Sequence, residues 1–410
     1  MYRISGYIAS WCRMGCYRKG AAVMYDVIII GAGASGLMAS IFAAKRGRKV
    51  LILDHADKAG KKILVSGGGK CNFTNRYISV NDYFGYNNSF CKYPLKHFTT
   101  ESVLKILKEA DIEIEERDFG RLFCKKSAVE IVSYLVGEAK KAGVHFFLNA
   151  NISEVSFATC FCIRCEDKQY ESSHLLVATG GLAWPQIGAT NFGYVVAKQF
   201  GHKIAPLKPA LAGFILLQDS PLMNLQGISL NAQLQIVDKS PAVEEPLLFT
   251  HKGISGPAAL QLSCYWEKDD VITINFLPSE NVISEMHKPG NGKKSVGRLL
   301  MQFLPERLVK AIVPNEFAER KVAELGKKCR NIIAGYIHSF PVHPCAIEGF
   351  SKAEATLGGV LTDEINPKNM ESLLMKGLYF SGEVIDITGK LGGYNIHWAF
   401  ASGFIAGQKI

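Results

Sequence analysis

The chain has 410 residues, of which 48% are hydrophobic and 20% charged, and it carries a formal net charge of +10. This composition excludes a disordered or fibrous chain and is sufficient for two or three hydrophobic cores. No apolar run reaches the roughly 18 residues of a membrane span. Eleven cysteines without an evident signal peptide predict reduced thiols and a cytoplasmic protein.

Residues 1–23 contain four basic residues and no acid, and they lack helical or strand periodicity. A transit peptide has a similar composition. We interpret the stretch as a disordered tail or an upstream extension, with Met24 as the natural start. Without it the net charge falls to +6, which is compatible with an anionic partner such as RNA.

Residues 25–54 carry a complete βαβ dinucleotide-binding pattern. The apolar run YDVIII predicts a buried strand, GAGASG follows, and an alanine-rich helix ends at Gly47 before the second strand KVLILD. The candidate binding residues are Gly31, Gly33, Ala34, Ser35, Gly36 and Asp54.

Each part of this pattern has a physical role. The first glycine makes the tight turn, the second lets a pyrophosphate approach the backbone, and the third lets helix and strand pack closely. The helix N-terminus offers free N–H groups to phosphate, and the acid accepts hydrogen bonds from a ribose. The pattern does not separate NAD from FAD. Residues 180–193 have glycines at the wrong spacing for a second fingerprint, so we expect one tightly held dinucleotide.

Two cysteine-containing stretches are candidate chemical sites. In SGGGKCNFTN, residues 66–75, three glycines indicate backbone that turns unusually or approaches something closely. Cys71 beside them is either a proton donor tuned by nearby lysine or a small buried residue that closes the turn. Cys160, Cys162 and Cys165 lack a fourth ligand at regular spacing and alternate as in a strand, so we predict no metal.

The middle of the chain contains a stretch with a strand pattern followed by a stretch with a helical pattern. Several short apolar runs within residues 211–277 predict a β-barrel, and SVGRLLMQFLPERLVKAI, with apolar spacing near 3.6, predicts helix. His251, in LFTHKGISGPAAL, either faces a substrate or is a loop residue bonded to backbone. Lys293, Lys294 and Arg298 either contact nucleic-acid backbone or form a solvated helix face.

Longer stretches carry a resemblance to a known family. SHLLVATGG, residues 173–181, resembles the A-T-G element of flavoproteins with the glutathione-reductase-type FAD fold. KGLYFSGEVIDITGKLGGYNIHWAFASG, residues 376–403, resembles the closing segment of such folds. With KKILVSGGGKCNFTN and FTHKGISGPAAL, these motifs identify the chain, from Met24 to its end, as a member of the BaiN-like, or aminoacetone-oxidase-like, FAD-binding oxidoreductases.

The resemblance implies an α/β fold, in which a glutathione-reductase-type FAD-binding Rossmann-like domain carries an inserted β-barrel and a small helical domain. It places the two parts of the FAD-binding domain at residues 24–195 and 345–410. The barrel-like insertion would occupy residues 196–280 and the helical insertion residues 281–344.

The resemblance also implies further FAD contacts. The glycine triplet would lie against the isoalloxazine, and two lysines would supply positive charge near phosphate or the reduced ring. Either Glu383 or Asp386 would take the place of the family's acid, and a helix N-terminus would face the flavin N1–C2 carbonyl. These residues are Lys62, Gly67, Gly68, Gly69, Lys70, Thr179, Gly180, Gly181, Gly382, Glu383, Asp386, Gly392, Gly393, Tyr394 and Asn395.

Three functions are consistent with the resemblance. The first is an NAD(P)H-driven reductase of an electron-poor C=C bond, with Cys71 and His251 as candidate catalytic residues and NAD(P)H as a transient donor. Its substrate would be a small conjugated molecule or uridine in ribosomal RNA, since family activities include dihydrouridine formation there. The second is an amine oxidase that uses O₂, and the third is a flavin-holding binding protein without turnover. The sequence does not indicate the oligomeric state.

Overall fold

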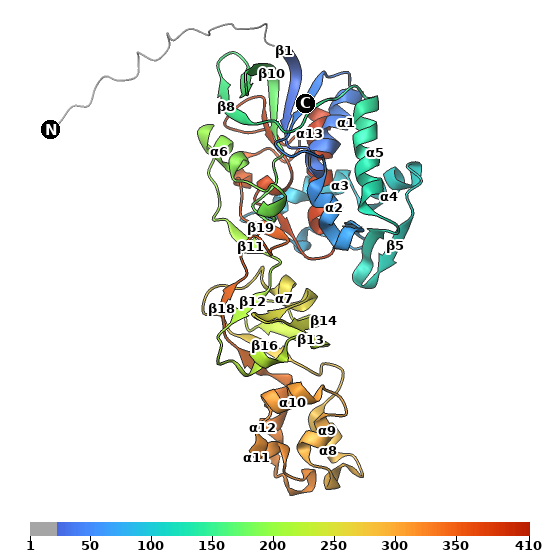
Figure 1. Ribbon diagram of the computed structural model, residues 1–410, viewed down its shortest axis with the longest axis vertical. Coiled ribbons are helices and arrows are strands. Elements are labelled where there is room, and N and C mark those ends of the chain that lie inside the picture. The colour runs from blue at the N-terminus through green and yellow to red at the C-terminus, as the bar shows by residue number, and fades with distance from the viewer. Residues whose placement is uncertain (1–22) are drawn as a thin grey trace, which may run out of the picture.

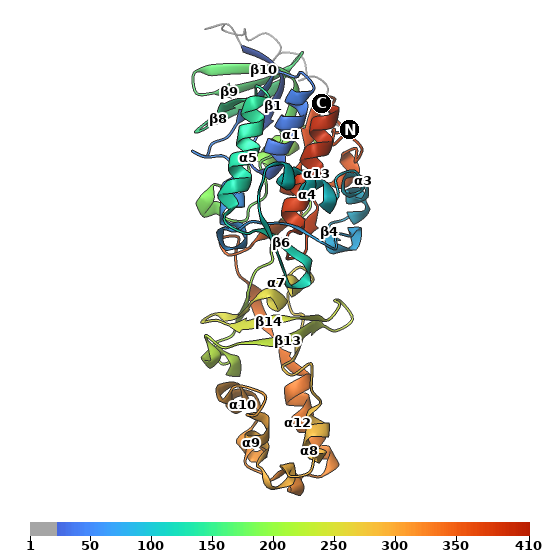
Figure 2. The ribbon, with the colours of Figure 1, turned by 90° about the vertical axis from the view of Figure 1, so that its right-hand side faces the viewer.

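The computed structural model describes residues 23–410, which form three parts along one long axis (Figures 1 and 2). The predicted tail or extension at residues 1–23 therefore lies outside the described residues, apart from Val23, which begins the first strand. We call the parts the large domain, the sheet domain and the helical domain. The large domain contains the C-terminus, and the helical domain lies at the opposite end.

A mostly parallel sheet forms the centre of the large domain. Its strands, in spatial order, are β7 (His145–Phe147), β2 (Val50–Leu53), β1 (Val23–Ile30), β10 (Lys168–Val177), β9 (Phe161–Cys165) and β8 (Ile152–Phe157), and β20 (Leu378–Phe380) also pairs with β10. Only β9 and β8 run antiparallel to their neighbours. The predicted Rossmann-like fold is confirmed. The carboxyl ends of β1, β2 and β10 meet at one edge, where such sheets bind ligands.

The large domain also contains helices. They are α1 (Ala34–Lys45), α2 (Lys61–Val65), α3 (Lys92–His97), α4 (Thr100–Glu109), α5 (Ala128–Lys141), α6 (Phe192–Gln199) and α13 (Tyr394–Lys409). The helices α1 and α13 pack directly on each other. A Cβ atom on Gly403 or Gly407 of α13 would collide with the α1 backbone, so the two helices approach closely. The large domain is thereby built from both ends of the described chain.

Small sheets complete the large domain. The first contains β3 (Asn72–Asn75), β6 (Arg121–Cys124) and β5 (Ile114–Arg117), the second β4 (Tyr83–Phe84) and β21 (Thr388–Gly389), and the third β11 (Lys208–Ala210) and β19 (Ala355–Leu357). The chain leaves the large domain through β11 and returns through β19. Because these strands pair with each other, the outgoing and returning connections lie side by side.

The sheet domain is a seven-stranded antiparallel sheet, and the predicted barrel-like insertion is confirmed. Its strands, in spatial order, are β17 (Phe340–Val342), β16 (Ile272–Asn275), β13 (Ser229–Ile236), β14 (Val243–Phe249), β15 (Gly253–Ser255), β12 (Phe214–Leu216) and β18 (Pro344–Ile347). The helix α7 (Pro257–Leu262) packs against β14 and β13.

The helical domain contains α8 (Val282–His287), α9 (Val296–Leu300), α10 (Glu306–Ile312), α11 (Asn315–Ala318) and α12 (Lys327–His338). The helical pattern of residues 295–312 is divided into α9 and α10, because Pro305 has extended backbone and starts a new helix. The backbone N–H of Val282 donates to Nε2 of His338 at 3.2 Å, so the start of α8 lies beside the end of α12.

The insertions are joined more closely than the sequence indicated. One hydrophobic core is shared by the sheet and helical domains, and a separate core fills the large domain. The sheet domain, expected at residues 196–280, also includes β17 and β18, which lie at the end of the expected helical insertion (residues 281–344) and just beyond it. The helix α6 belongs to the core of the large domain and crosses the expected boundary at residue 195. No helix within residues 23–410 is both long and apolar enough to cross a membrane.

Candidate cofactor and active site

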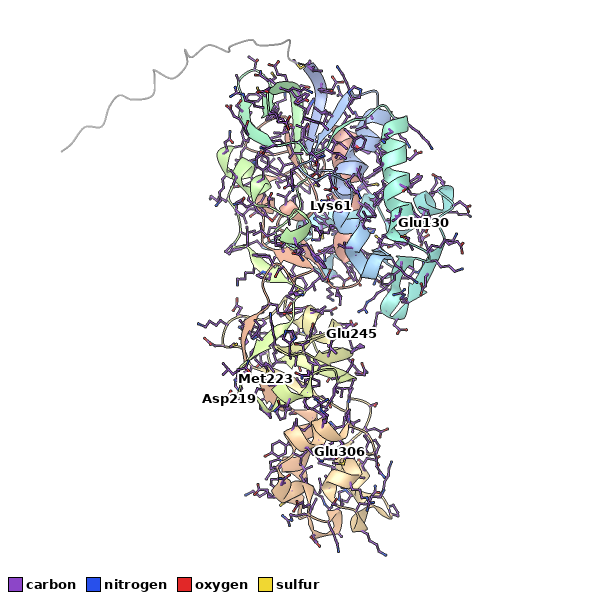
Figure 3. All side chains as sticks on the ribbon, in the orientation of Figure 1. Lys61, Glu130, Asp219, Met223, Glu245 and Glu306 are labelled. Carbon is purple, nitrogen blue, oxygen red and sulfur yellow. The ribbon has the colours of Figure 1, made fainter. Side chains whose placement is uncertain are left out.

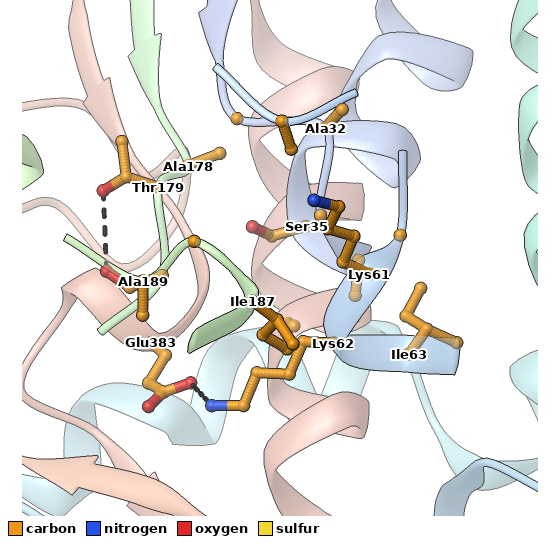
Figure 4. Close-up of a pocket in the computed structure, with 18 of the residues that line it drawn as sticks. Ala32, Ser35, Lys61, Lys62, Ile63, Ala178, Thr179, Ile187, Ala189 and Glu383 are labelled. Carbon is orange, nitrogen blue, oxygen red and sulfur yellow. Dashed lines mark hydrogen bonds and ion pairs between the residues drawn. The ribbon is translucent and has the colours of Figure 1, made fainter. Parts of the chain in front are cut away.

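A cavity with about 960 Å³ of empty space lies at the edge where β1, β2 and β10 end (Figure 4). Its walls include the glycine loop after β1, Asp54 after β2, and residues 179–181 after β10. A second cavity shares Gly31, Asp54 and Thr179 with it and continues beyond the Asp54 carboxylate. The topology therefore brings the predicted dinucleotide residues to one site.

The glycine loop leaves space where a pyrophosphate would lie. A Cβ on Gly31 would collide with the carbonyl oxygen of Ala178, and one on Gly36 would collide with that of Gly31. Gly33 differs, because no atom lies within 4 Å of its Cβ position. No side chain caps α1, so the free N–H groups of its first turn border this open space. The arrangement fits the phosphates of a dinucleotide.

Asp54 holds the glycine loop and borders the cavity. Its Oδ2 atom accepts the N–H of Ala32 at 2.6 Å, and its Oδ1 atom accepts the N–H of Ala56 at 2.8 Å. These bonds fix the carboxylate in one orientation while its remaining lone pairs stay free to accept hydrogen bonds from a ribose.

Glu383, rather than Asp386, is the acid that reaches the cavity. Its Oε2 atom lies 2.6 Å from Nζ of Lys62, and its Oε1 atom accepts the N–H of Thr356 at 2.9 Å (Figure 4). Asp386 is buried elsewhere and accepts the N–H of Tyr86 at 2.9 Å. Burial raises the pKa of the Asp386 carboxyl. The two alternatives for the family's acid are thus separated by geometry.

A further cavity, with about 1190 Å³ of empty space, continues the site toward the sheet domain. It shares Lys62, Asn395 and Ile396 with the first cavity, so the two form one groove. The large domain supplies most of its lining, including Gly392 and Gly393 before α13. No side chain caps α13, so the helix N-terminus borders this part of the groove.

The glycine triplet forms one edge of this second half of the groove. Gly67, Gly68 and Gly69 have φ values of 57°, 67° and 84°, a left-handed run that glycine adopts without strain. A Cβ on Gly67 would lie 2.8 Å from the Phe123 ring, whereas the Cβ position of Gly68 has no atom within 4 Å. Gly67 and Gly68 line the groove and Gly69 does not. Glycine is needed at these positions for the left-handed backbone conformation, and the absence of side chains also lets a ligand in the groove approach the backbone closely.

Sequence comparison identifies the family. The model described as HI0933-like protein Rossmann domain matches residues 25–409. The chain belongs to the HI0933-like family. The resemblance inferred from the motifs is confirmed, and the protein is a FAD-type oxidoreductase.

Named relatives of this HI0933-like protein span nearly its whole length. Ribosomal RNA dihydrouridine synthase of Escherichia coli is 37% identical over 394 residues, which cover 94% of this chain and 98% of the relative. The enzyme of the same name from Haemophilus influenzae is 38% identical over 392 residues, covering 93% and 98%. A 3-dehydro-bile acid delta(4,6)-reductase of Clostridium scindens is 28% identical over 412 residues, covering 94% and 98%.

The HI0933-like site also contains residues that the sequence did not reveal. Trp184, Arg121, Lys390 and Glu354 line the second half of the groove. Arg121 forms an ion pair with Glu245, which lies in the sheet domain next to the large domain (Figure 3). No local spacing marks these side chains, because tertiary structure alone brings them together.

Glu354 is the most unusual of these residues. Burial raises the pKa of its carboxyl, the Glu383 carboxylate raises it further, and the Lys62 ammonium and the Trp184 indole oppose that shift only in part. A carboxyl of this kind can hold a proton nearer to neutral pH than an exposed one.

Two candidate catalytic residues do not reach the groove. Cys71 is fully buried, and burial raises the pKa of its thiol to about 12. The structure therefore supports the alternative role of Cys71 as a small residue inside the turn. His251 is exposed in the turn between β14 and β15 and is absent from the lining of all three cavities described above. Neither position supports the expected catalytic role, because neither side chain lines the groove in which a flavin ring would lie.

Two candidate cofactor residues also point elsewhere. The Tyr394 ring is buried edge-on against Tyr83, with 6.1 Å between ring centroids, and burial raises the pKa of its hydroxyl to about 12. Nζ of Lys70 lies 3.2 Å from Oε2 of Glu115 and outside the cavity linings. Of the two predicted lysines, Lys62 alone lines the groove.

Proposed function

We propose that this protein is an FAD-dependent reductase that uses NAD(P)H to saturate the C=C bond of uridine in ribosomal RNA. The observation that carries the proposal is the continuous groove, whose dinucleotide half leads at Lys62 into a second half beside the sheet domain. The flavin ring and the nucleobase would lie in the second half, which is open to solvent. The substrate class follows the relatives that are 37–38% identical along nearly the whole chain.

The chain's own residues divide the work of holding the cofactor. The α1 N-terminus and Gly33 would bind the pyrophosphate, and Asp54 would bind a ribose. Glu383 and Lys62 would lie along the middle of the cofactor, as an ion pair with little net charge. The N-terminus of α13 would face the ring and favour negative charge there.

Reduction of a C=C bond needs a hydride for one carbon and a proton for the other. FAD, when bound, supplies the hydride chemistry. We assign the proton to the Glu354 carboxyl, since it lines the second half of the groove and its pKa is raised. Trp184 lines the same half of the groove and would border the substrate beside this carboxyl. NAD(P)H would enter the same half of the groove transiently, because the sequence offers no second dinucleotide fingerprint.

The test is nucleoside mass spectrometry. Purified protein, NAD(P)H and unmodified ribosomal RNA are incubated without oxygen, and the RNA is digested and analysed for dihydrouridine. Product above the controls without enzyme and without NAD(P)H supports the proposal.

If NAD(P)H bleaches the flavin but no dihydrouridine forms, the RNA substrate is wrong and small conjugated molecules become the substrates to test. If NAD(P)H does not bleach the flavin, the reductase itself is wrong, and the amine oxidase and the flavin-holding protein remain.

A further inference from the structure

The net positive charge of the described chain is concentrated in the helical domain. Residues 281–338 contain eleven lysine and arginine residues and five aspartate and glutamate residues. The rest of residues 23–410 contains 32 basic and 32 acidic residues. A general surplus for solubility would be spread over the surface, so the imbalance points to a local purpose.

Six of these eleven basic residues lie on neighbouring segments, namely the end of α8, residues 291–294, and residues 321–328 at the start of α12. The end of α12 adjoins the sheet domain through β17, so the beginning of α12 lies at the far end. There Nη1 of Arg330, on α12, lies 2.6 Å from Nε2 of His287, the last residue of α8. We call the following side chains the distal basic cluster: Lys288, Lys293, Lys294, Lys321, Lys327 and Lys328.

Few carboxylates neutralise this cluster. Within residues 23–410, Lys288 is the only one of the six in an ion pair, which it forms with Glu285. The remaining lysines are exposed, except that Lys294 is half-buried. Their charges therefore remain available to an anion outside the protein.

The start of α12 adds free backbone N–H groups to this cluster. This helix has no side-chain cap and no acid in its first turn, and that turn carries Lys327 and Lys328 instead. Positive side chains are unfavourable at a helix N-terminus, where the free N–H groups already carry partial positive charge. A bound phosphate would relieve this repulsion and accept hydrogen bonds from the same N–H groups.

We propose that the distal basic cluster binds phosphate groups of the RNA substrate at a distance from the base that is reduced. This inference rests on the proposed function. The groove is lined by the large domain and its connections to the sheet domain, and the cluster lies at the far end of the helical domain, so a mononucleotide reaches only one of them. Folded ribosomal RNA reaches both. Lysine contacts to phosphate position the RNA without reading its sequence.

The test measures RNA binding without turnover. A fluorescently labelled fragment of ribosomal RNA is titrated with the FAD-loaded protein at several salt concentrations, and the dissociation constant is read from anisotropy. The triple variant K293Q/K327Q/K328Q removes three exposed charges of the cluster. The matched control K96Q/K105Q/K108Q removes three exposed charges of the large domain.

For the wild type we expect the logarithm of the association constant, the reciprocal of the measured dissociation constant, to fall linearly with the logarithm of the salt concentration. The cluster variant should bind more weakly, and its slope should be smaller by about one for each phosphate contact removed. Its melting temperature should not fall, because two unfavourable charges leave the start of α12. The control should keep the affinity and the slope of the wild type.

Other results overturn the inference. These are no RNA binding by the wild type, equal losses in both triple variants, or a cluster variant that loses affinity for polyglutamate but not for RNA. The last result would indicate an acidic protein partner. Dihydrouridine formation is measured separately. If dihydrouridine forms but the cluster variant binds RNA as tightly as the wild type, the inference fails and the proposed function stands. If the cluster variant binds RNA more weakly but the wild type forms no dihydrouridine, the proposed function alone is contradicted.

Discussion

Nζ of Lys62 lies 2.6 Å from Oε2 of Glu383, although 321 positions separate the two residues. Lys62 is on α2 and Glu383 follows β20, so the ion pair connects the N-terminal and C-terminal parts of the large domain at the cavity wall. Lys62 remains 38% exposed and Glu383 13% exposed. The ammonium group thus offsets a carboxylate that would otherwise repel the phosphates of a dinucleotide.

Replacing this lysine should weaken cofactor binding. In K62M the Glu383 carboxylate loses its charge partner, and we expect the dissociation constant for FAD to rise about tenfold, which corresponds to about 1.4 kcal/mol. The measurement is a titration of apoprotein with FAD, followed by flavin fluorescence. K70M is the control, because Lys70 pairs with Glu115 outside the groove and its loss should leave the constant unchanged. Equal effects of both substitutions would contradict this assignment.

Two glycines of one loop should respond differently to alanine. G36A places a Cβ against the carbonyl oxygen of Gly31 and should lower the free energy of unfolding of the apoprotein by about 1–3 kcal/mol. G33A meets no protein atom and should change that free energy by about 1 kcal/mol or less, while it weakens FAD binding by occupying the phosphate space. Guanidinium unfolding and FAD titration measure the two effects. A G33A variant with normal FAD affinity would show that the phosphates lie elsewhere.

Removing the proposed proton donor should slow reduction without releasing the cofactor. We expect E354Q to lose about 100-fold or more in the rate of dihydrouridine formation and to retain FAD. The wild-type rate should fall as the pH rises above the pKa of Glu354, because only the protonated carboxyl donates. E354Q should lack that fall.

Cys71 provides the comparison for this experiment. C71A should keep the rate and its pH dependence, because the thiol is buried away from the groove. A large loss of rate in C71A together with a normal rate in E354Q would restore the cysteine as the donor and contradict the assignment to Glu354.

The accuracy of the sequence predictions depended on whether the signal was local. Asp54 and the glycine loop after β1 were predictable because about thirty consecutive residues specify the βαβ unit. Glu354 and Trp184 could not be predicted, because no sequence motif contains both residues. Glu354 reaches the groove only because it directly precedes the returning strand β19. For Cys71 the sequence left two roles open, because its neighbours indicated reactivity, whereas burial is a property of the folded protein.

His397 should make the protein less stable in acid. It is fully buried, with Nδ1 2.7 Å from Oγ1 of Thr74 and Nε2 3.1 Å from the carbonyl oxygen of Phe98. Burial lowers its pKa to about 4, below the value of about 6.5 in the unfolded chain. The unfolded state therefore binds more protons between these values, and stability is lost as the pH falls from about 6.5 to about 4.

The H397Q substitution isolates this contribution. Glutamine can bond to the same two partners but does not titrate, so the variant should lose up to about 3 kcal/mol less stability than the wild type across that pH range. Denaturant unfolding at a series of pH values provides the comparison. Parallel stability curves for the two proteins would mean that His397 does not titrate with folding.

The pairing of β11 with β19 has a consequence for how this architecture arose and can be altered. Both covalent connections of the inserted segment lie next to each other on the large domain, so the segment can be regarded as one exchangeable unit. Its removal would leave ends close enough for a short turn to reconnect. Evolution can therefore replace the sheet and helical domains, and thereby change which substrates reach the flavin, without changes to the Rossmann-like core.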